Sequence, residues 1–443
     1  MAKTMSVKTD NRPIDRILSP FQEFFQREAS SGILLIIATI LALVWANSPW
    51  ADSYQSLWHT TVSFNFGDFS ISKDLLHWIN DGLMAVFFFV VGLEIKREVL
   101  VGELASPRKA ILPIVAAIGG MVIPAGIYLL FNPRGPAQAG WGIPMATDIA
   151  FALGVLSLLG KRAPLSLKIF LTAVAIVDDL GAVLVIALFY TSNIVWLSLI
   201  VGGIVFVVLI IMSRLGVRSP LVYAILGIVL WVAFLKSGVH ATIAGVLLAL
   251  TIPVRTRINT EEFVSNATYF VEKFRIHGET GESVLTNKNQ RASLQAIEDA
   301  AEQAQTPLQR LEHNLHPWVS YFVMPVFALA NAGIVIKGDF LSAFAQPVTL
   351  GVMAGLIFGK QIGVFGASYL TVKLGWSDLP AGMTWARLYG LSWLAGIGFT
   401  MSLFIAGLAF GESEFLAMSK AGILVASLIA GIVGAIILSR PKK

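Results

Sequence analysis

The sequence contains no cysteine and has few charged residues. Without cysteine, the chain can form no disulfide, no thiolate nucleophile and no cysteine-ligated metal site. Aspartate, glutamate, lysine and arginine make up 13% of its 443 residues, whereas soluble proteins carry roughly a quarter. This shortage of charge argues against an ordinary soluble globular protein.

Hydrophobic residues are abundant instead, at 56% of the chain. A helix that crosses a bilayer needs about 20 mainly apolar residues, and runs of this kind recur along the sequence. We therefore expect an all-α polytopic membrane protein with about twelve transmembrane helices. The expected spans are 32–48, 76–95, 110–131, 140–159, 165–190, 194–213, 219–235, 238–253, 316–336, 348–372, 384–410 and 415–438.

The net charge of +5 does not indicate nucleic-acid binding, because most basic residues lie between the apolar runs. Lys and Arg accumulate in cytoplasmic loops, and alternate loops of this chain differ strongly in their basic content. The bias predicts a bacterial inner-membrane protein with two cytoplasmic ends, residues 1–31 and 439–443, around a transmembrane domain at 32–438. The first 30 residues lack the apolar core of a cleavable signal peptide.

Two segments do not fit the membrane pattern. Residues 60–72 alternate apolar and polar side chains around Gly67-Asp68, which predicts a periplasmic β-hairpin. Its free edge could pair with a second copy of the chain or remain a simple surface feature. Residues 254–312 form a long polar cytoplasmic loop. Residues 290–313 look helix-prone, but a solvated linker is expected for most of the loop.

Six ionisable residues lie within the apolar runs. A charge at the centre of a membrane helix costs about 2.5–3.5 kcal/mol on insertion scales, so such residues are candidates for function. The six are Asp81, Glu94, Asp148, Asp178, Asp179 and Lys360.

Asp178 and Asp179 are adjacent in the apolar run "AIVDDLGAV". Two neighbouring carboxylates disfavour double ionisation, so one of them holds a proton more tightly. Carboxylate oxygens also suit hard cations. The pair can therefore exchange protons for a cation such as Na⁺ or Li⁺. The alternative is a neutral, protonated pair that only bonds neighbouring helices.

Two apolar runs are interrupted by glycine, proline and threonine: "PMATDIAFALG" and "GIGFTMSLFIAG". Interrupted helices in corresponding positions indicate a transporter built from inverted repeats. Broken helices leave opposed partial charges at mid-membrane, and Asp148 is well placed to balance the positive ends. The residues singled out at the two breaks are Thr147, Asp148, Gly398 and Thr400. Lys360, in the middle of another run, needs a charged partner and could balance negative helix ends there.

A further group of charges marks the expected cytoplasmic ends of the helices. These charges could sense pH, since histidine titrates near neutrality, or they could only fix topology and pack at the interface. The candidates are Glu94, Arg97, Glu98, His240 and Glu312.

With these motifs, the chain resembles the NhaA family of bacterial Na⁺/H⁺ antiporters over nearly its whole length. The resemblance rests on "INDGLMAVFFFVVGLEIKRE", "MATDIAFALGVLSLLG", "AIVDDLGAV", "LKSGVHATIAGV", "RLEHNLHPWV", "ANAG" and "GIGFTMSLFIA". It implies electrogenic exchange of two protons per Na⁺ and a homodimer joined through the hairpin. It further implies a cation and proton site at Asp178 and Asp179, with Lys360 as the partner of Asp178. It implies that the two interrupted helices cross at mid-membrane, at Thr147, Asp148, Gly398 and Thr400. The same resemblance implies pH-regulating roles for Glu94, Arg97, Glu98, His240 and Glu312. The loop at 254–312 departs from it, being longer than expected for the family's best-known members.

The sequence thus predicts a secondary antiporter without a cofactor, which exports Na⁺ or Li⁺ in exchange for H⁺ and has no nucleic-acid partner. Three alternatives remain. An intramembrane aspartyl protease usually carries its two aspartates on different helices. An enzyme acting on lipid phosphates needs more carboxylates beside the pair to hold a metal. A passive cation channel needs no coupling to protons.

Overall fold

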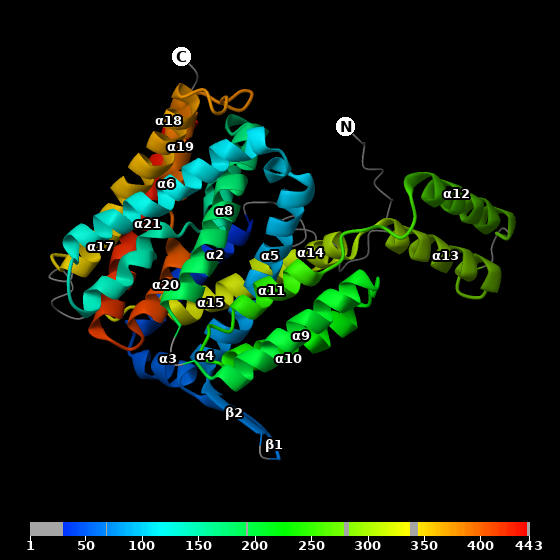
Figure 1. The fold of residues 1–443 in the computed structure, drawn as a ribbon, viewed down its shortest axis with the longest axis horizontal. Coiled ribbons are helices and arrows are strands. Elements are labelled where there is room, and N and C mark those ends of the chain that lie inside the picture. Colours follow the sequence, from blue (N-terminus) through cyan, green and yellow to red (C-terminus); the bar gives the residue numbers. More distant parts are fainter. Residues whose placement is uncertain (1–29, 68, 192–193, 279–282, 337–343, 441–443) are drawn as a thin grey trace. The chain divides into compact units, whose positions relative to one another are not determined.

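The computed structural model describes residues 30–67, 69–191, 194–278, 283–336 and 344–440. Most of these residues are helical (Figure 1). The chain divides into two compact units. Unit 1 lies within residues 1–76, 103–184 and 324–443, and unit 2 lies within 77–102 and 185–323.

Unit 1 contains the longest helices and the two strands. Its elements are α2 (Ser30–Ala46), α3 (Ala51–Trp58), β1 (Thr61–Phe66), β2 (Phe69–Asp74), η2 (Glu103–Ala105), α6 (Pro107–Phe131), η3 (Pro136–Met145), α7 (Ile149–Leu158), η4 (Gly160–Arg162), most of α8 (Leu165–Phe189), α15 (Met324–Asn331), α17 (Pro347–Ala354), η6 (Gly355–Gly359), η7 (Gln361–Phe365), α18 (Gly366–Lys373), α19 (Trp385–Ala395), α20 (Phe399–Phe410) and α21 (Glu414–Ser439). Here η denotes a 3₁₀ or π turn. The short α4 (Leu75–His77) joins the two units in sequence.

Unit 2 is built around α5, which packs closely against α11. Its elements are η1 (Trp78–Leu83), α5 (Met84–Val101), α9 (Trp196–Arg214), α10 (Pro220–Leu235), α11 (Ile243–Thr251), α12 (Thr260–Ile276), α13 (Lys288–Ala304), α14 (Pro307–Trp318) and η5 (Val319–Val323).

The helices fit a multi-pass membrane protein. Each of the twelve predicted spans overlaps helical residues. Within the described ranges, six helices are long and apolar enough to cross a membrane, or eight if each of two bent pairs is one span. The number twelve and the inverted repeats therefore stay predictions.

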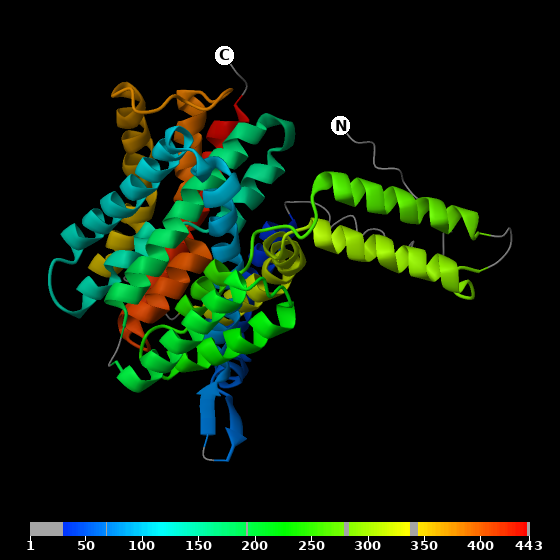
Figure 2. The same cartoon turned by 45° about the vertical axis from the view of Figure 1, so that its right-hand side comes forward.

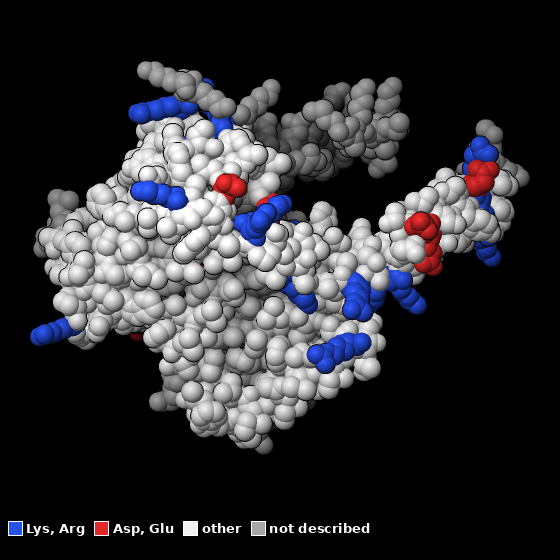
Figure 3. All heavy atoms as spheres, turned by 45° about the horizontal axis from the view of Figure 1, so that its top comes forward, with Lys and Arg blue, Asp and Glu red and all other residues white. Residues whose placement is uncertain are grey.

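The surface supports the same conclusion. Figure 3 shows one face on which charged side chains form separate spots on a mainly uncharged surface. On α9, Leu197 is 74% exposed and Ile204 is 59% exposed. Apolar side chains displayed in this way are stable in hydrocarbon, where charges are costly.

The predicted hairpin is present. Strands β1 and β2 pair antiparallel, with Thr61 opposite Asp74 and Phe66 opposite Phe69, so the strands extend to 74 rather than 72 (Figure 2). Gly67 in the turn has a φ of +57°, a left-handed conformation that glycine adopts without steric cost. Asp68, the other predicted turn residue, lies outside the described residues.

The segment 254–312 is not mainly a solvated linker, and that expectation was wrong. The helix-prone half does form α13 and the start of α14, but the first half also forms a helix, α12. Asn259 and Asn287 cap the N-termini of α12 and α13 by accepting backbone N–H bonds, which satisfies donors that a helix start leaves free. Figures 1 and 2 both show α12 and α13 side by side.

Candidate functional site

The two adjacent aspartates lie in the middle of α8 and are almost completely buried. Asp178 and Asp179 are each 1% exposed. Side chains of consecutive helix residues diverge by about 100°, so the two carboxylates leave α8 in different directions. An Oδ2 atom of Asp178 lies 2.9 Å from Nζ of Lys360.

Lys360 is also only 1% exposed. Its Nζ donates to Asp178 and to the carbonyl oxygen of Met145. Two π turns, η6 and η7, flank this residue directly. A π turn shifts the backbone hydrogen bonds by one residue relative to an α-helix, and such turns are frequent at functional sites. In this span they flank Lys360, whose ammonium group is buried inside unit 1.

Gly120 of α6 provides the room for the lysine side chain. A Cβ added at Gly120 would lie 3.7 Å from Nζ and from Cδ of Lys360, and 2.7 Å from a methyl group of Val364. The lysine stem therefore packs against bare backbone of α6. A small residue at this point lets two helices approach closely.

The two interrupted helices meet at their breaks. The first break separates η3 from α7, and the second separates α19 from α20 with a bend of 41°. Thr147 donates its hydroxyl to the carbonyl of Ala395 at 2.8 Å. The backbone N–H of Asp148 donates to the carbonyl of Ile397 at 2.7 Å. The breaks thus bind each other through backbone groups that an unbroken helix would use internally.

Asp148 accepts hydrogen bonds from both helices that start at the crossing. Its side chain accepts from the backbone N–H of Phe151, at 2.9 Å, and of Thr400, at 3.0 Å. The hydroxyl of Thr400 also donates to it. The N-termini of α7 and α20 each carry partial positive charge. The carboxylate of Asp148, 1% exposed, therefore balances two helix dipoles.

Gly398 fits the crossing because it has no side chain. A Cβ there would lie 2.2 Å from Oγ of Ser402 and 3.1 Å from the carbonyl oxygen of Ala146. Ser402 itself donates to the carbonyl of Ile143. A methyl group at Gly398 would therefore displace the hydroxyl of Ser402 and crowd the carbonyl of Ala146.

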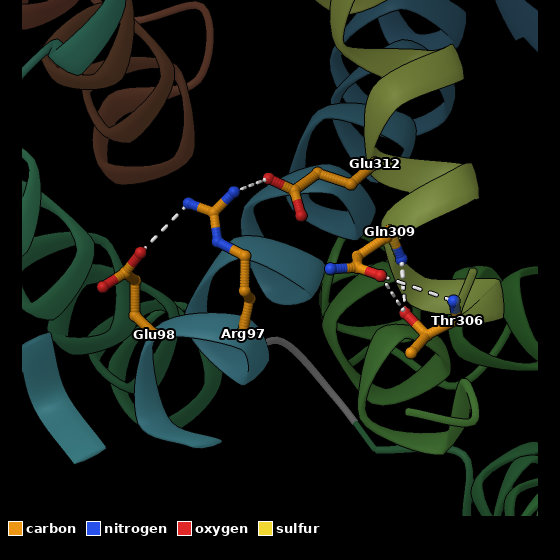
Figure 4. A network of polar contacts seen from close by, with 5 residues as sticks. All are labelled: Arg97, Glu98, Thr306, Gln309 and Glu312. Atoms are coloured by element: carbon orange, nitrogen blue, oxygen red, sulfur yellow. Dashed lines mark hydrogen bonds and ion pairs between the residues drawn. The ribbon is translucent and has the colours of Figure 1, made fainter. Parts of the chain in front are cut away.

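The charges proposed for pH regulation lie in unit 2. Arg97 of α5 donates to Glu312 of α14 and, at 3.0 Å, to Glu98 (Figure 4). Glu94, half-buried on the same helix, interacts electrostatically with Arg97, Glu98 and Glu312. These four residues form one cluster. Burial raises the pKa of the Glu312 carboxyl, while the guanidinium of Arg97 acts in the opposite direction.

His240 lies apart from these contacts. Its Nε2 is 3.6 Å from Oδ1 of Asp81, and its Nδ1 is 2.8 Å from the hydroxyl of Thr242. Asp81 belongs to the π turn η1, and its carbonyl accepts from the indole N–H of Trp231. The sequence singled out Asp81 as a buried acid but did not link it to His240.

Other contributors to the crossing were missed. They are the carbonyls of Ile143, Met145, Ala395 and Ile397 and the hydroxyl of Ser402. Carbonyl roles have no residue-type signal. Ser402, however, lies four residues after Gly398, a spacing that places it on the same face of α20 as the break.

Among the residues that the structure describes, no group of three or more His, Cys, Asp or Glu side chains is arranged to hold a resident metal. Na⁺, as cargo, would instead use oxygen ligands at the buried aspartates. Carboxylate and carbonyl oxygens are the ligands that such hard cations prefer.

Comparisons with known proteins all match this chain to one family. The model of the family described as Na⁺/H⁺ antiporter 1 matches residues 22–438. The Na⁺/H⁺ antiporter NhaA of Oleidesulfovibrio alaskensis is 56% identical over 425 residues, which cover 96% of this chain and 94% of that protein. The NhaA antiporter of Koribacter versatilis is 50% identical over 97% of this chain and 93% of its own length. An antiporter of Saccharophagus degradans, NhaA 1, is 51% identical over 96% of this chain and 92% of its own.

Proposed function

The chain belongs to the Na⁺/H⁺ antiporter 1 family and is a secondary transporter rather than an enzyme, and we propose that Asp178 and Asp179 are the site where Na⁺ and H⁺ compete. Family membership sets aside the protease, the lipid-phosphate enzyme and the passive channel. The proposal concerns which residues carry the exchange and how they couple it.

The observation that carries the proposal is the charge balance of the buried group in unit 1. It holds three carboxylates, those of Asp148, Asp178 and Asp179, and the ammonium of Lys360, all 1% exposed. The helix N-termini compensate Asp148, and the ammonium of Lys360 pairs with Asp178 and also attracts Asp179. Two adjacent carboxylates disfavour double ionisation, so this group favours uptake of a further cation, either H⁺ or Na⁺.

Coupling follows because the same oxygens serve both ions. A proton on an aspartate removes the negative charge that binds Na⁺, and a bound Na⁺ lowers the affinity for the proton. Loading one ion releases the other. Alternating access then moves the site between the two sides of the membrane, and no step requires a cofactor.

Lys360 gives the exchange a second titrating group. When Na⁺ occupies the aspartates, it competes with the ammonium for Asp178, which weakens the ion pair of 2.9 Å. A buried ammonium without its partner releases its proton more readily. Lys360 would therefore carry one proton and an aspartate the other, which gives two protons per Na⁺ and net charge movement.

The test uses inside-out vesicles with a respiration-driven pH gradient followed by a fluorescent dye. Na⁺ and Li⁺ should collapse the gradient in wild type, and K⁺ should not. Asp179→Asn should be silent at every pH. The matched control is Glu272→Gln, the same chemical change at an acid 50% exposed on α12, which should transport normally. An active Asp179→Asn variant would refute the site.

Charge movement is tested separately in proteoliposomes without a pH gradient. A K⁺ diffusion potential should drive Na⁺ uptake or release if two protons move per Na⁺. Equal exchange carries no net charge and would not respond. An unresponsive but active protein would overturn the stoichiometry while leaving the aspartate site in place.

We also propose a homodimer joined through β1 and β2. The strands form a two-stranded sheet, whose outer edges can add a strand from a second copy. Native mass spectrometry should find dimers of wild type and monomers after the hairpin is shortened to a two-residue turn. Dimers that survive the shortening would exclude this interface.

A further inference from the structure

The segment between α11 and α14 is a folded element with its own polar contacts. The amide of Gln290 on α13 donates to the carbonyl of Phe274 on α12, at 3.2 Å. The amide of Asn287 donates to the carbonyl of His277, at 2.7 Å. We call α12 and α13 together the helical arm. Its function is not explained by the transport site.

The arm continues into α14 through a short joint. Only Gln305 and Thr306 separate the end of α13 from Pro307, the first residue of α14. The hydroxyl of Thr306 accepts from the backbone N–H of Gln309, and the side chain of Gln309 accepts in return from the backbone N–H of Thr306. This capping box fixes the direction in which the chain enters α14.

Two further contacts brace the joint. Arg310 of α14 lies 2.6 Å from Glu302 of α13. The carbonyl of Gln303 accepts from the backbone N–H of Arg257, which precedes α12, at 2.9 Å. The segment before α12 is therefore fastened to the last turn of α13, and that turn is braced to the first turn of α14.

The next turn of α14 carries Glu312. Figure 4 shows the capping pair Thr306 and Gln309 on the same helix as Glu312, which contacts Arg97. A rotation of the first turn of α14 must move Glu312 relative to Arg97, because a helix transmits such a rotation along its axis. The charged or titratable groups that face Glu312 are Arg97, Glu98 and Glu94 of α5, and His313 and His316 of α14.

We propose that the helical arm is a lever on α14, and that Glu302, Thr306, Gln309 and Arg310 are positioning residues that hold Glu312 against Arg97. The arm thereby sets the pH at which this cluster changes its charge. The proposal rests on the pH regulation suggested by the family resemblance and adds a place through which it can be adjusted. Anything that bends the arm would shift the pH response without touching the transport site.

The experiment measures antiport against pH for variants of the joint. Thr306→Ala removes the capping hydroxyl, and Arg310→Glu breaks the brace. Both should move the midpoint of the pH profile to higher pH, because a carboxylate farther from Arg97 holds its proton more tightly. Because the brace of Glu302 and Arg310 is partly exposed and contributes modestly, we expect a shift of about half a pH unit.

Conservative variants separate positioning from general damage. Thr306→Ser keeps the hydroxyl and should keep the wild-type profile. The swap Glu302→Arg with Arg310→Glu restores the brace and should restore the midpoint. The matched control is the swap of Glu272 and Arg275, an ion pair of 2.7 Å on the same arm but away from the joint, which should leave the midpoint unchanged.

The outcomes distinguish this proposal from the one on which it rests. A pH-dependent wild type whose midpoint is unmoved by Thr306→Ala and Arg310→Glu would overturn the lever alone. A wild type that transports equally at every pH would remove both the regulation and the lever. A midpoint shift that the charge swap reverses would support both.

Discussion

Lys360 and Asp178 are the two charges in unit 1 that depend most on each other, since both side chains are 1% exposed and 2.9 Å apart. Removing one partner of a buried ion pair leaves the other uncompensated, which costs about 3–5 kcal/mol. We therefore expect Lys360→Met to lower the thermal unfolding temperature in detergent. Asp178→Asn should lower it less, because Asp179 remains to attract the ammonium of Lys360.

The double variant Asp178→Asn with Lys360→Met is the informative one. It removes both charges, so it should unfold at a higher temperature than Lys360→Met alone. If the double variant is less stable than either single one, the pair does not act as a unit. The exposed pair Glu272 and Arg275 serves as the control, where single changes should have an effect of about 1 kcal/mol or less.

The raised pKa of Glu312 predicts in which direction the stability of the protein changes with pH. Burial raises the pKa of its carboxyl above the usual 4.5, so the folded protein binds this proton more tightly than the unfolded chain. The contribution of Glu312 to the free energy of unfolding is fully present at pH values below the ordinary carboxyl pKa. It is lost as pH rises through the raised pKa. Relative to Glu312→Gln, the unfolding temperature of the wild type should therefore fall as pH rises from the ordinary carboxyl range through the raised pKa. A difference that stays constant with pH would contradict the shift.

The sequence made the charged residues of the site visible, because a carboxylate or ammonium inside an apolar run has few structural explanations. It could not show which of them touch. The contact between Asp148 and Thr400 joins residues 252 positions apart, and that between Lys360 and Asp178 spans 182. Such pairings depend on how helices pack, which periodicity does not specify. The functional roles of all these residues stay predictions.

At the scale of elements, the contact between α6 and the span that carries Lys360 depends on glycine. A Cβ at Gly363 would lie 2.2 Å from the carbonyl oxygen of Gly119 and 2.6 Å from its carbon. These are backbone atoms, so the two helices must separate to admit a methyl group. Gly363→Ala should lower both stability and antiport, the latter because Lys360 is displaced from Asp178.

Gly366 provides the control for this change on the same span. Nothing lies within 4 Å of a Cβ placed there, and alanine favours a helix over glycine by up to about 1 kcal/mol. Gly366→Ala should therefore be neutral or stabilising, with normal transport. Equal behaviour of the two variants in unfolding and vesicle assays would show that close packing at Gly363 is unimportant.

Some helices, strands and turns could be predicted from the sequence and others could not. Long apolar runs and the alternating strands gave correct types, because their periods of hydrophobicity match one structure. The π turns around Lys360 were not foreseen, since they arise where packing forces an extra residue into a helical turn. Helix α12 was missed because its mixed polarity resembles a linker. Its apolar residues Phe263, Phe270 and Phe274 are in fact partly covered.

At the scale of the whole molecule, the absence of cysteine makes the proposed topology directly testable. Single cysteines can be placed at Ser70 on β2 and at Ser265 on α12, both exposed, with no background thiol to react. The distribution of Lys and Arg predicts that the hairpin faces the periplasm, whereas the arm and both termini are cytoplasmic. In spheroplasts, an impermeant maleimide should then label Ser70→Cys at once and Ser265→Cys only after the membrane is opened. Inside-out vesicles should give the reverse order. Labelling of both sites from one side would place hairpin and arm together, and would contradict the orientation on which the cytoplasmic position of the Arg97 and Glu312 cluster depends.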